Sequence, residues 1–450
     1  MRAIPVVRAS MAVLAVLIAL LFISCPAKEG TMAADAGGPP SAGPVILVSD
    51  QLNPAEEAAA LRDRILGEFK GTVDFRPREG SMLAPETMAA LVETPPRPVA
   101  IGGLHADFKD LWAAGLLAPL DGLYRKLESR GFVPALVDLA RLDGSTMFYV
   151  PWMQASYVLA INRKALDYLP PGVDVRTITY DQLTAWGAAM IQVTGRRLVG
   201  FPAGDKGLMH RFLQGYLYPS FTGSTLVKFR SDDAVAMWER FRRLWDVVNP
   251  SSVTYSTMAD PLLAEEVWVA WDHTARLTKA FRERPGDFMA VPAPIGPRGR
   301  GFMAVISGLG MAAGNAEADG APAGGAEALV EYLTRPEVQR LTLAETGFFP
   351  VLKEGARADV PSPLDSLADA VVAQSAAPES VLTLLPTGLG ARGGDYNKAF
   401  LLTFSDIVLG GRDIRATLDA NAAVIQAIID ETGAPCWLPD VSDGKPCRLE

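Results

Sequence analysis

The segment from Glu266 to Leu277, E-V-W-V-A-W-D-H-T-A-R-L, brings two tryptophans, an acid, a histidine and an arginine together. If it begins as a β-strand, alternation sends Trp268 and Asp272 to one face and Trp271 to the other. An aromatic ring can pack on an apolar face of a ligand, and a carboxylate can accept hydrogen bonds from the ligand's hydroxyls or amines. Trp271 and Asp272 at the strand's carboxyl end are therefore candidate ligand contacts. The structural alternatives are core packing for Trp271, helix capping for Asp272, and an ion pair between Asp272 and Arg276.

Catalytic motifs are missing from the chain. It contains no Gly-x-Ser-x-Gly, no His-Glu-x-x-His and no P-loop, and its three histidines, His105, His210 and His273, are scattered. With 51 Asp and Glu residues, accidental pairs of carboxylates are certain, so their presence does not indicate a glycosidase. We expect no enzyme activity, no cofactor and no structural metal site.

The N-terminal residues predict export. Arg2 and Arg8 precede the apolar run Met11 to Ile23, which is short for a membrane span and typical of a signal peptide over residues 1–24. The end of this run, L-F-I-S-C, resembles a bacterial lipobox, in which Cys25 becomes the acylated first residue. A plain secretory signal is the alternative. Residues 25–44 are rich in Gly and Pro and predict a lipidated flexible tether.

Composition and cysteine use agree with an exported protein. The formal net charge of −9 and the absence of Lys/Arg clusters exclude a nucleic-acid partner. In an oxidising compartment, Cys436 and Cys447 are expected to form a disulfide in the proline-containing tail, residues 432–450.

The pattern along the chain favours an α/β protein. The run P-V-I-L-V-S-D at residues 44–50 predicts a strand buried on both faces, and helical and apolar segments then alternate. This alternation is typical of parallel βαβ units. A similar alternation restarts near Met147.

Several stretches together resemble the sugar-binding family of extracellular solute-binding proteins of bacterial ABC transporters, which includes maltose-binding proteins. The segments that carry the resemblance are Y-V-P-W-M-Q-A-S-Y-V-L-A-I-N-R-K-A-L (149–166), T-I-T-Y-D-Q-L (177–183), A-V-P-A-P-I-G-P-R-G-R-G with I-S-G-L-G-M-A-A, A-L-V-E-Y-L-T-R-P-E-V-Q, and T-G-F-F-P-V (346–351). They span nearly all of the exported chain, in the family's order. The sequence departs from the family's pattern at E-E-V-W-V-A-W-D-H-T-A-R-L.

The resemblance implies a two-lobe periplasmic-binding-protein-like fold, in which each lobe is a mainly parallel sheet flanked by helices. Crossover hinge segments join the lobes, and a ligand closes the cleft between them. We expect residues 45–154 plus 290–312 in the first lobe and residues 155–289 plus 313–431 in the second.

Further candidate ligand contacts follow strand ends and crossover segments. Each has a structural alternative, such as loop solvation or hinge packing. These candidates are Asp50, Gln51, Trp152, Tyr157, Phe348, Tyr396 and Asn397.

The expected function is capture of a mono- or oligosaccharide by a monomeric, membrane-anchored lipoprotein facing the periplasm or cell exterior. The resemblance implies delivery to an ABC permease, with the lipid bilayer as a further partner through Cys25. The alternatives are a secreted, lipid-anchored carbohydrate-active hydrolase, or the same fold binding a peptide or polyamine or serving as a sensor subunit.

Overall fold

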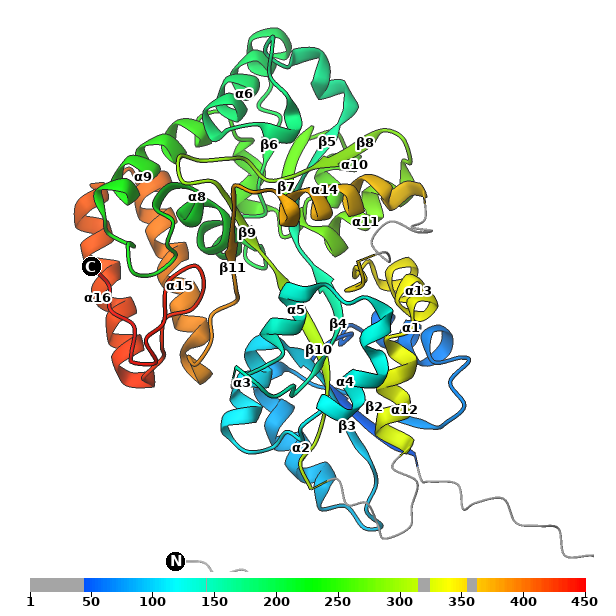
Figure 1. Ribbon diagram of the computed structural model, residues 1–450. Helices are drawn as coiled ribbons and strands as arrows, with labels where there is room; N and C mark the ends of the chain where they lie inside the picture. The colour runs from blue at the N-terminus through cyan, green and yellow to red at the C-terminus, as the bar shows by residue number, and fades with distance from the viewer. Residues whose placement is uncertain (1–43, 143, 315–323, 354–361) are drawn as a thin grey trace, which may run out of the picture. The chain divides into compact units, whose positions relative to one another are not determined.

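The computed structural model describes residues 44–142, 144–314, 324–353 and 362–450. Its first sheet has the strand order β2-β1-β3-β10-β4 (Figure 1). The strands are β1 (Val45–Ser49), β2 (Val73–Pro77), β3 (Val99–Leu104), β4 (Val150–Ala155) and β10 (Val305–Met311). Every residue of β1 is buried, as expected for a central strand covered by helices on both faces.

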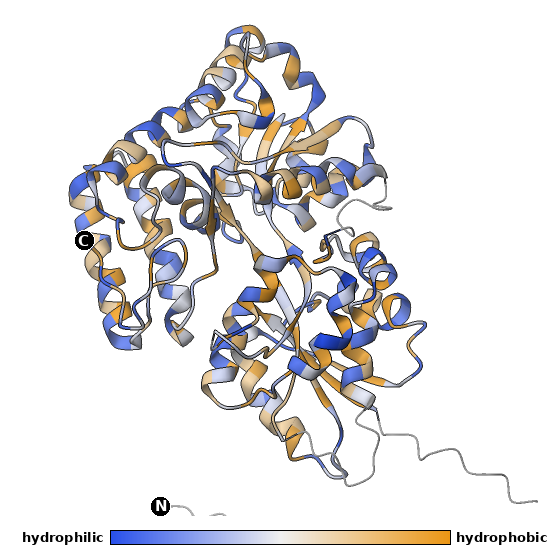
Figure 2. Cartoon of the chain, in the orientation of Figure 1, coloured by the Kyte–Doolittle hydropathy of each residue, from blue (hydrophilic) through white to orange (hydrophobic). Residues whose placement is uncertain are grey.

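Helices flank this sheet, and their apolar faces form its core (Figure 2). They are α1 (Ala55–Ala60), α2 (Leu83–Leu91), α3 (His105–Ala113), α4 (Asp121–Leu127), α5 (Pro134–Leu139), α12 (Gly324–Leu333) and α13 (Pro336–Thr346). Helix α12 packs against β1, β3 and β10, and Leu329, Val330 and Leu333 are buried in the same cluster as β1.

The second sheet has the order β6-β7-β5-β8. Its strands are β5 (Tyr157–Asn162), β6 (Val199–Gly200), β7 (Val269–His273) and β8 (Phe288–Val291). The helices of this part are α6 (Tyr180–Thr194), α7 (Met209–Phe212), α8 (Tyr218–Thr222), α9 (Asp232–Trp245), α10 (Ala259–Leu263), α11 (Thr274–Glu283), α14 (Asp365–Ala376), α15 (Gly393–Phe404) and α16 (Ile414–Thr432). A separate pair joins β9 (Arg300–Met303) in parallel to β11 (Ser380–Thr383).

The α/β architecture is confirmed, but the sheets are mixed rather than mainly parallel. In the first sheet β1 is parallel to β2 and β3, whereas β10 is antiparallel to β3 and β4. In the second, β5 is antiparallel to β7 and β8, and only β6 and β7 are parallel. The crossing strands cause this mixture, because a chain that returns from one sheet to the other enters it in the opposite direction.

The packing of α12 and α13 also bears on the expected lobe boundaries. The sequence predicts residues 313–431 in the second lobe, whereas α12 packs on the first sheet and α13 packs on α1 and on the turn Leu61–Ile65 that follows it. The buried apolar residues of α12 and Val338 of α13 belong to the first core, because the chain has already crossed to the first sheet at β10. Leu343, later in α13, is buried in another cluster with residues of α11 and α14. We therefore assign residues 324–346 to the first part of the molecule.

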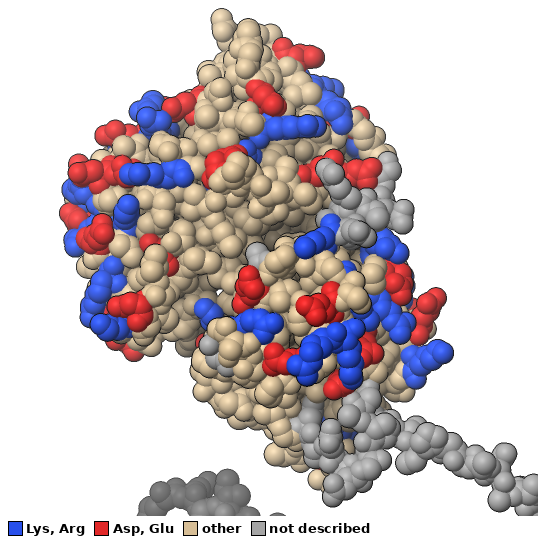
Figure 3. Space-filling view, in the orientation of Figure 1, with Lys and Arg blue, Asp and Glu red and all other residues tan. Residues whose placement is uncertain are grey.

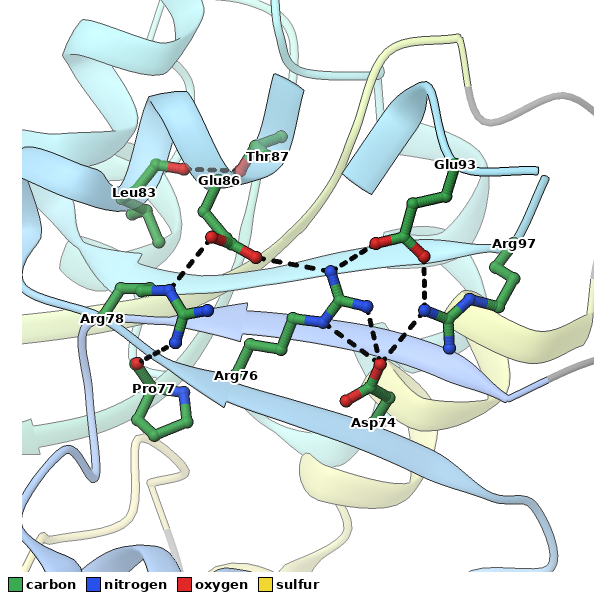
Figure 4. A network of polar contacts seen from close by, with 9 residues as sticks. All are labelled: Asp74, Arg76, Pro77, Arg78, Leu83, Glu86, Thr87, Glu93 and Arg97. Atoms are coloured by element: carbon green, nitrogen blue, oxygen red, sulfur yellow. Dashed lines mark hydrogen bonds and ion pairs between the residues drawn. The ribbon is translucent and has the colours of Figure 1, made fainter. Parts of the chain in front are cut away.

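An ion-pair network covers the edge strand β2 (Figure 4). The Arg76 guanidinium lies 2.7 Å from Asp74, 3.3 Å from Glu86 and 2.6 Å from Glu93, and Arg97 also contacts Asp74 and Glu93. Charged side chains on an edge strand discourage pairing with a further strand. On the molecular face drawn in Figure 3, acidic and basic side chains are interspersed.

The C-terminal tail is tied down at two points. A disulfide joins Cys436 to Cys447, whose Cα atoms are 4.6 Å apart. Between them, the buried Asp440 carboxylate accepts hydrogen bonds from the Ser224 hydroxyl and from the backbone N–H groups of Thr225 and Leu226, at 3.0 and 2.8 Å. Within the described part of the chain, no helix combines the length and apolarity needed to cross a membrane.

Candidate ligand-binding site

A cavity of about 490 Å³ lies where the carboxyl end of the first sheet meets the segment that leads into α15. Its size falls in the range of small-molecule sites. The lining residues are Gly80, Leu83, Ala84, Leu104, Ala106, Asp107, Asp110 and Leu111 on the side of the first sheet, and Arg211, residues 385–391, Gly393 and Asn397 on the other. None of the described residues that line it is aromatic, although the sequence predicted an aromatic bed.

Two carboxyl groups meet at this end of the first sheet. Asp50 follows β1 directly, and Asp107 lies in the first turn of α3, which begins at the end of β3. Their carboxyl groups are hydrogen-bonded to each other. Gly80, which follows β2, leaves room for them, because a Cβ atom there would lie 3.3 Å from Asp107 Oδ1 and 3.5 Å from Asp50 Oδ2. Three neighbouring parallel strands thus converge on one polar site.

Burial and mutual repulsion keep these two carboxyls from ionising together. Burial, with the charge of Asp50 as a further cause, raises the pKa of Asp107 to about 8. Burial also raises the pKa of Asp50, although hydrogen bonds from Asp107 and from the Gln51 amide, at 2.9 Å, oppose the rise. Near neutral pH the pair therefore shares one proton, which the two carboxyls use in their mutual hydrogen bond, so the remaining carboxyl oxygens offer a ligand acceptors.

The opposite wall carries a cation. Arg211 of α7 lines the cavity and is half-buried, and its one hydrogen bond among the described residues is to Gln214 Oε1 at 3.4 Å. Gln214 Nε2 in turn donates to Asn397 Oδ1 at 3.0 Å, which positions the Asn397 amide at the cavity wall. Burial lowers the pKa of Arg211, partly offset by Tyr157 and Tyr396 nearby.

Two of the predicted aromatic contacts, Tyr157 and Trp271, pack on each other near Arg211. The rings of Tyr157 and Trp271 are stacked, with centroids 4.8 Å apart and planes 3° apart, and Tyr216 meets both rings edge-on. The register of β5 and β7 explains the cluster, because Tyr157 pairs with His273 and Trp271 lies two residues earlier on the same face. Both stacked rings are at least 97% buried, and Trp271 Nε1 has no partner among the described residues.

Asp272 does not line the cavity. It points to the opposite face of β7 from Trp271, is fully buried, and accepts hydrogen bonds from the backbone N–H groups of Met258 and His273 at 2.8 and 2.7 Å. Burial raises its pKa to about 6. The expected ion pair with Arg276 is absent, because that guanidinium donates to the backbone carbonyl of Ser256 at 2.9 Å. This aspartate joins β7 to α10.

The other predicted residues lie at varying depth. Asn397 lines the cavity, whereas Asp50 contacts the lining residue Asp107 and does not itself line the cavity. Trp152 is buried in the first core, and the Gln51 amide supports Asp50. Tyr396 is fully buried against Trp437 with its hydroxyl unpartnered among the described residues, and Phe348 is half-buried beside His273. Cys25 lies outside the described residues.

Sequence reasoning missed Gly80, Asp107, Asp110 and Arg211. Asp107 could have been found by the argument that selected Asp50, since it follows the next buried strand of the same sheet. Arg211 carries no such signal, because it lies in a short helix far along the chain and reaches the cavity only through tertiary packing. Within the described residues, no cluster of His, Cys, Asp or Glu could hold a metal ion.

A cavity with hydrogen-bonding walls, set between two α/β bodies with helix-covered sheets, defines a protein that binds a small solute. The sequence matches the family model described as "Bacterial extracellular solute-binding protein" over residues 67–365, more than half of the chain. The chain belongs to this family, as the sequence resemblance predicted. The family's members are binding proteins, and no curated protein matches the sequence.

Solved structures share the fold over whole chains. The sugar-binding protein MalE of Xanthomonas citri is 16% identical, with a TM-score of 0.67 over 86% of this chain and 98% of MalE. The GacH receptor of Streptomyces glaucescens, solved with acarbose, is 18% identical, with a TM-score of 0.63 over 87% and 99%. UgpB of Mycobacterium tuberculosis, solved with glycerophosphocholine, is 20% identical, with a TM-score of 0.64 over 87% and 99%. These likenesses confirm the predicted two-lobe fold.

Proposed function

We propose that this protein captures a carbohydrate in the cavity beside Asp107, Arg211 and Asn397 and delivers it to an ABC permease. The observation that carries the proposal is the set of hydrogen-bonding groups that reach one cavity from both sides: a proton-sharing carboxyl pair on one wall, a guanidinium and an amide on the other. Sugar hydroxyls donate and accept, so both walls can bind one molecule.

The ligands of similar proteins support a carbohydrate. The X. citri MalE is a sugar-binding protein, and the GacH receptor was solved with acarbose. A ligand that contacts both walls binds the closed arrangement better than the open one and shifts the population toward closure. In this proposal the closed form is the one that docks on the permease.

We propose binding without hydrolysis. A retaining glycosidase holds its two carboxyl groups about 5 to 5.5 Å apart and an inverting enzyme holds them farther apart. Asp107 lines the cavity and Asp50 does not, so the two carboxyl groups do not stand on either side of a glycosidic bond bound there. Release of reducing sugar from an oligosaccharide panel incubated with the protein would contradict this part of the proposal.

The proposal also includes export, acylation at Cys25 and a monomeric state. The L-F-I-S-C ending of the apolar N-terminal run supports acylation. Expression of the full chain and of Cys25→Ala in a bacterial host, followed by membrane fractionation, tests the anchor. We expect the wild-type protein in the membrane fraction and the variant in the soluble exported fraction; a membrane-bound variant would count against acylation.

A thermal-shift panel of mono- and disaccharides, followed by calorimetry on the hits, tests carbohydrate capture. A ligand present at a hundred times its dissociation constant stabilises the folded state by about 2.7 kcal/mol. We expect at least one sugar to reach this shift. Stabilisation by peptides or polyamines, with none by any sugar, would favour the alternative ligands.

A further inference from the structure

The two walls of the cavity differ in how their charges are compensated. Arg211 is half-buried, and no carboxylate of a described residue lies within ion-pair distance of it. Its single bond, to the neutral Gln214 side chain, is long at 3.4 Å. Arg76, Arg284 and Arg392 each pair with two or more acids, whereas Arg276, which also has no acid partner among the described residues, donates to the backbone carbonyls of Ser256 and Lys206.

The carboxyl pair on the other side of the cavity can lower the cost of its burial without a ligand. Asp50 and Asp107 share a proton, so the pair loses part of its charge without a ligand. A guanidinium cannot lose its proton in a protein. The carboxyl pair still keeps one negative charge, which is spread over two hydrogen-bonded carboxyl groups, whereas the positive charge at Arg211 has no acid among the described residues within ion-pair distance. Asp110 also lines the cavity, on the same side as Asp107; partial burial of its carboxyl, with the charge of Asp107 as a further cause, raises its pKa.

Hydrogen-bond donors without partners accompany Arg211. The Asn397 side chain accepts from Gln214 through Oδ1, which leaves its amide N–H groups at the cavity wall without a partner in the described part of the chain. Tyr396 lies close enough to Arg211 for an electrostatic interaction, but it is fully buried and does not line the cavity. Arg211 and the Asn397 amide therefore present only donors at this wall, which suits the oxygens of an anion.

We propose that Arg211 and Asn397 form an anion subsite, so that the ligand is a carbohydrate bearing a carboxylate or phosphate group. The anionic group lies against Arg211, and the hydroxyls at the other end of the ligand meet Asp107. This inference rests on the proposed function and narrows its ligand class. A carboxylate and a phosphate share the chemistry that Arg211 recognises, and the experiment separates them.

Calorimetric titration of the full chain near neutral pH with matched ligands tests the subsite. The pairs are glucose with glucuronate and maltose with maltobionate; glucose 1-phosphate is the phosphate arm and glucosamine the cationic arm. We expect an anionic member to bind at least about tenfold more tightly than its neutral counterpart. Its advantage shrinks between about 20 and about 500 mM NaCl, because salt screens the attraction. This salt dependence needs no mutation.

Substitution then locates the subsite. In Arg211→Gln, we expect the ratio of anionic to neutral affinity to fall toward one, whereas Arg211→Lys keeps part of it. Arg298→Gln removes the same charge from an exposed ion pair with Asp233 and serves as the matched control. We expect this variant to keep the wild-type ratio of anionic to neutral affinity. Thermal melts of each variant establish that it folds.

The outcomes distinguish the two proposals. Neutral sugars that bind as tightly as their anionic counterparts, tighter binding of glucosamine, or an unchanged ratio in Arg211→Gln would each overturn the anion subsite and leave carbohydrate capture standing. If no sugar, neutral or charged, binds the wild-type protein, both proposals fall. A preference for glucuronate over glucose 1-phosphate assigns the carboxylate, and the reverse assigns the phosphate.

Discussion

Asp50 and Asp107 show how a site can be polar without carrying full charge. Their carboxyl groups meet because β1 and β3 are neighbours in a parallel register and both end at the same edge. The absence of a side chain at Gly80 lets them approach. The shared proton makes one of them a hydrogen-bond donor at neutral pH, a role that a free aspartate could not fill.

The shared proton leads to a prediction on Asp107→Asn. The pKa of Asp107 is raised to about 8, so the folded state holds a proton that the unfolded chain releases above pH 4. The free energy of unfolding therefore falls as pH rises from about 4 through about 8. An asparagine amide donates to Asp50 without this cost, so we expect the variant to gain on the order of 1 kcal/mol at pH 8 and nothing near pH 4. Urea unfolding between about pH 4 and about pH 8 measures the difference in free energy of unfolding between the variant and the wild type. A difference that does not change with pH would contradict the raised pKa of Asp107.

Single elements are held by polar contacts that sequence periodicity does not reveal. The edge strand β2 is fixed to α2 through Arg76 and Glu86, and the tail is fixed to the segment before α9 through Asp440. Both arrangements use a charge to satisfy several partners at once. Such contacts stabilise more than isolated surface ion pairs, because the shared group is already partly desolvated.

For β2, we predict that Arg76→Met lowers the free energy of unfolding by about 1–3 kcal/mol, since three carboxylates lose their shared cation. Arg298→Met, at an exposed pair, should lower it by less than about 1 kcal/mol. The Arg76 bonds lower the pKa of Glu93 to about 2, so this stabilisation is present above pH 4.5 and is lost as pH falls toward 2. Equal losses in the two variants by urea unfolding near pH 7 would show that the network adds nothing.

For the tail, we predict that Asp440→Ala costs about 2–4 kcal/mol, because the N–H groups of Thr225 and Leu226 lose a buried charged acceptor. Asp443→Ala changes the same tail at an exposed position beside Lys445 and serves as its control, with a cost below about 1 kcal/mol. Thermal unfolding with the disulfide intact compares the two. Similar melting temperatures would mean that Asp440 does not anchor the tail.

On the scale of the whole molecule, one buried side chain connects the segments that pass between the sheets. Gln374 of α14 donates to Ser156 Oγ and to the Tyr157 carbonyl, both at 3.1 Å, and accepts from the Ala293 N–H at 2.7 Å. Ser156 lies between β4 and β5 and also donates to the Met303 carbonyl at the end of β9. All of these segments pass between or lie next to the sheets, so Gln374 couples them.

We predict that Gln374→Leu destabilises the protein by about 2–4 kcal/mol, because a buried N–H and a buried carbonyl are left without partners. Ser375→Ala, at an exposed position one residue on, should change stability by less than about 0.5 kcal/mol. Urea unfolding followed by tryptophan fluorescence tests both. A Gln374→Leu variant as stable as Ser375→Ala would show that the connection contributes nothing.

Elements with a local signal were predictable, and contacts across the chain were not. The buried run of β1 and the strand at β7 follow from apolar patterning, and Asp50 follows from its place at a strand end. The packing of Trp271 depends on its stacking against Tyr157 of β5. The core that α12 joins depends on where the chain crosses between the two sheets. Neither is encoded by spacing.

The sequence by itself determined the α/β class, the family and the expectation of a cleft, because hydrophobic period and motif order are local properties of the chain. Only the tertiary structure decided which charges share the cavity. Asp107 and Arg211 are 104 positions apart, 211 − 107, and they line one wall each of the same space because separate parts of the molecule fold around it. The balance of charge there, and with it the kind of ligand, follows from burial and from the distances between groups, which no one-dimensional pattern contains.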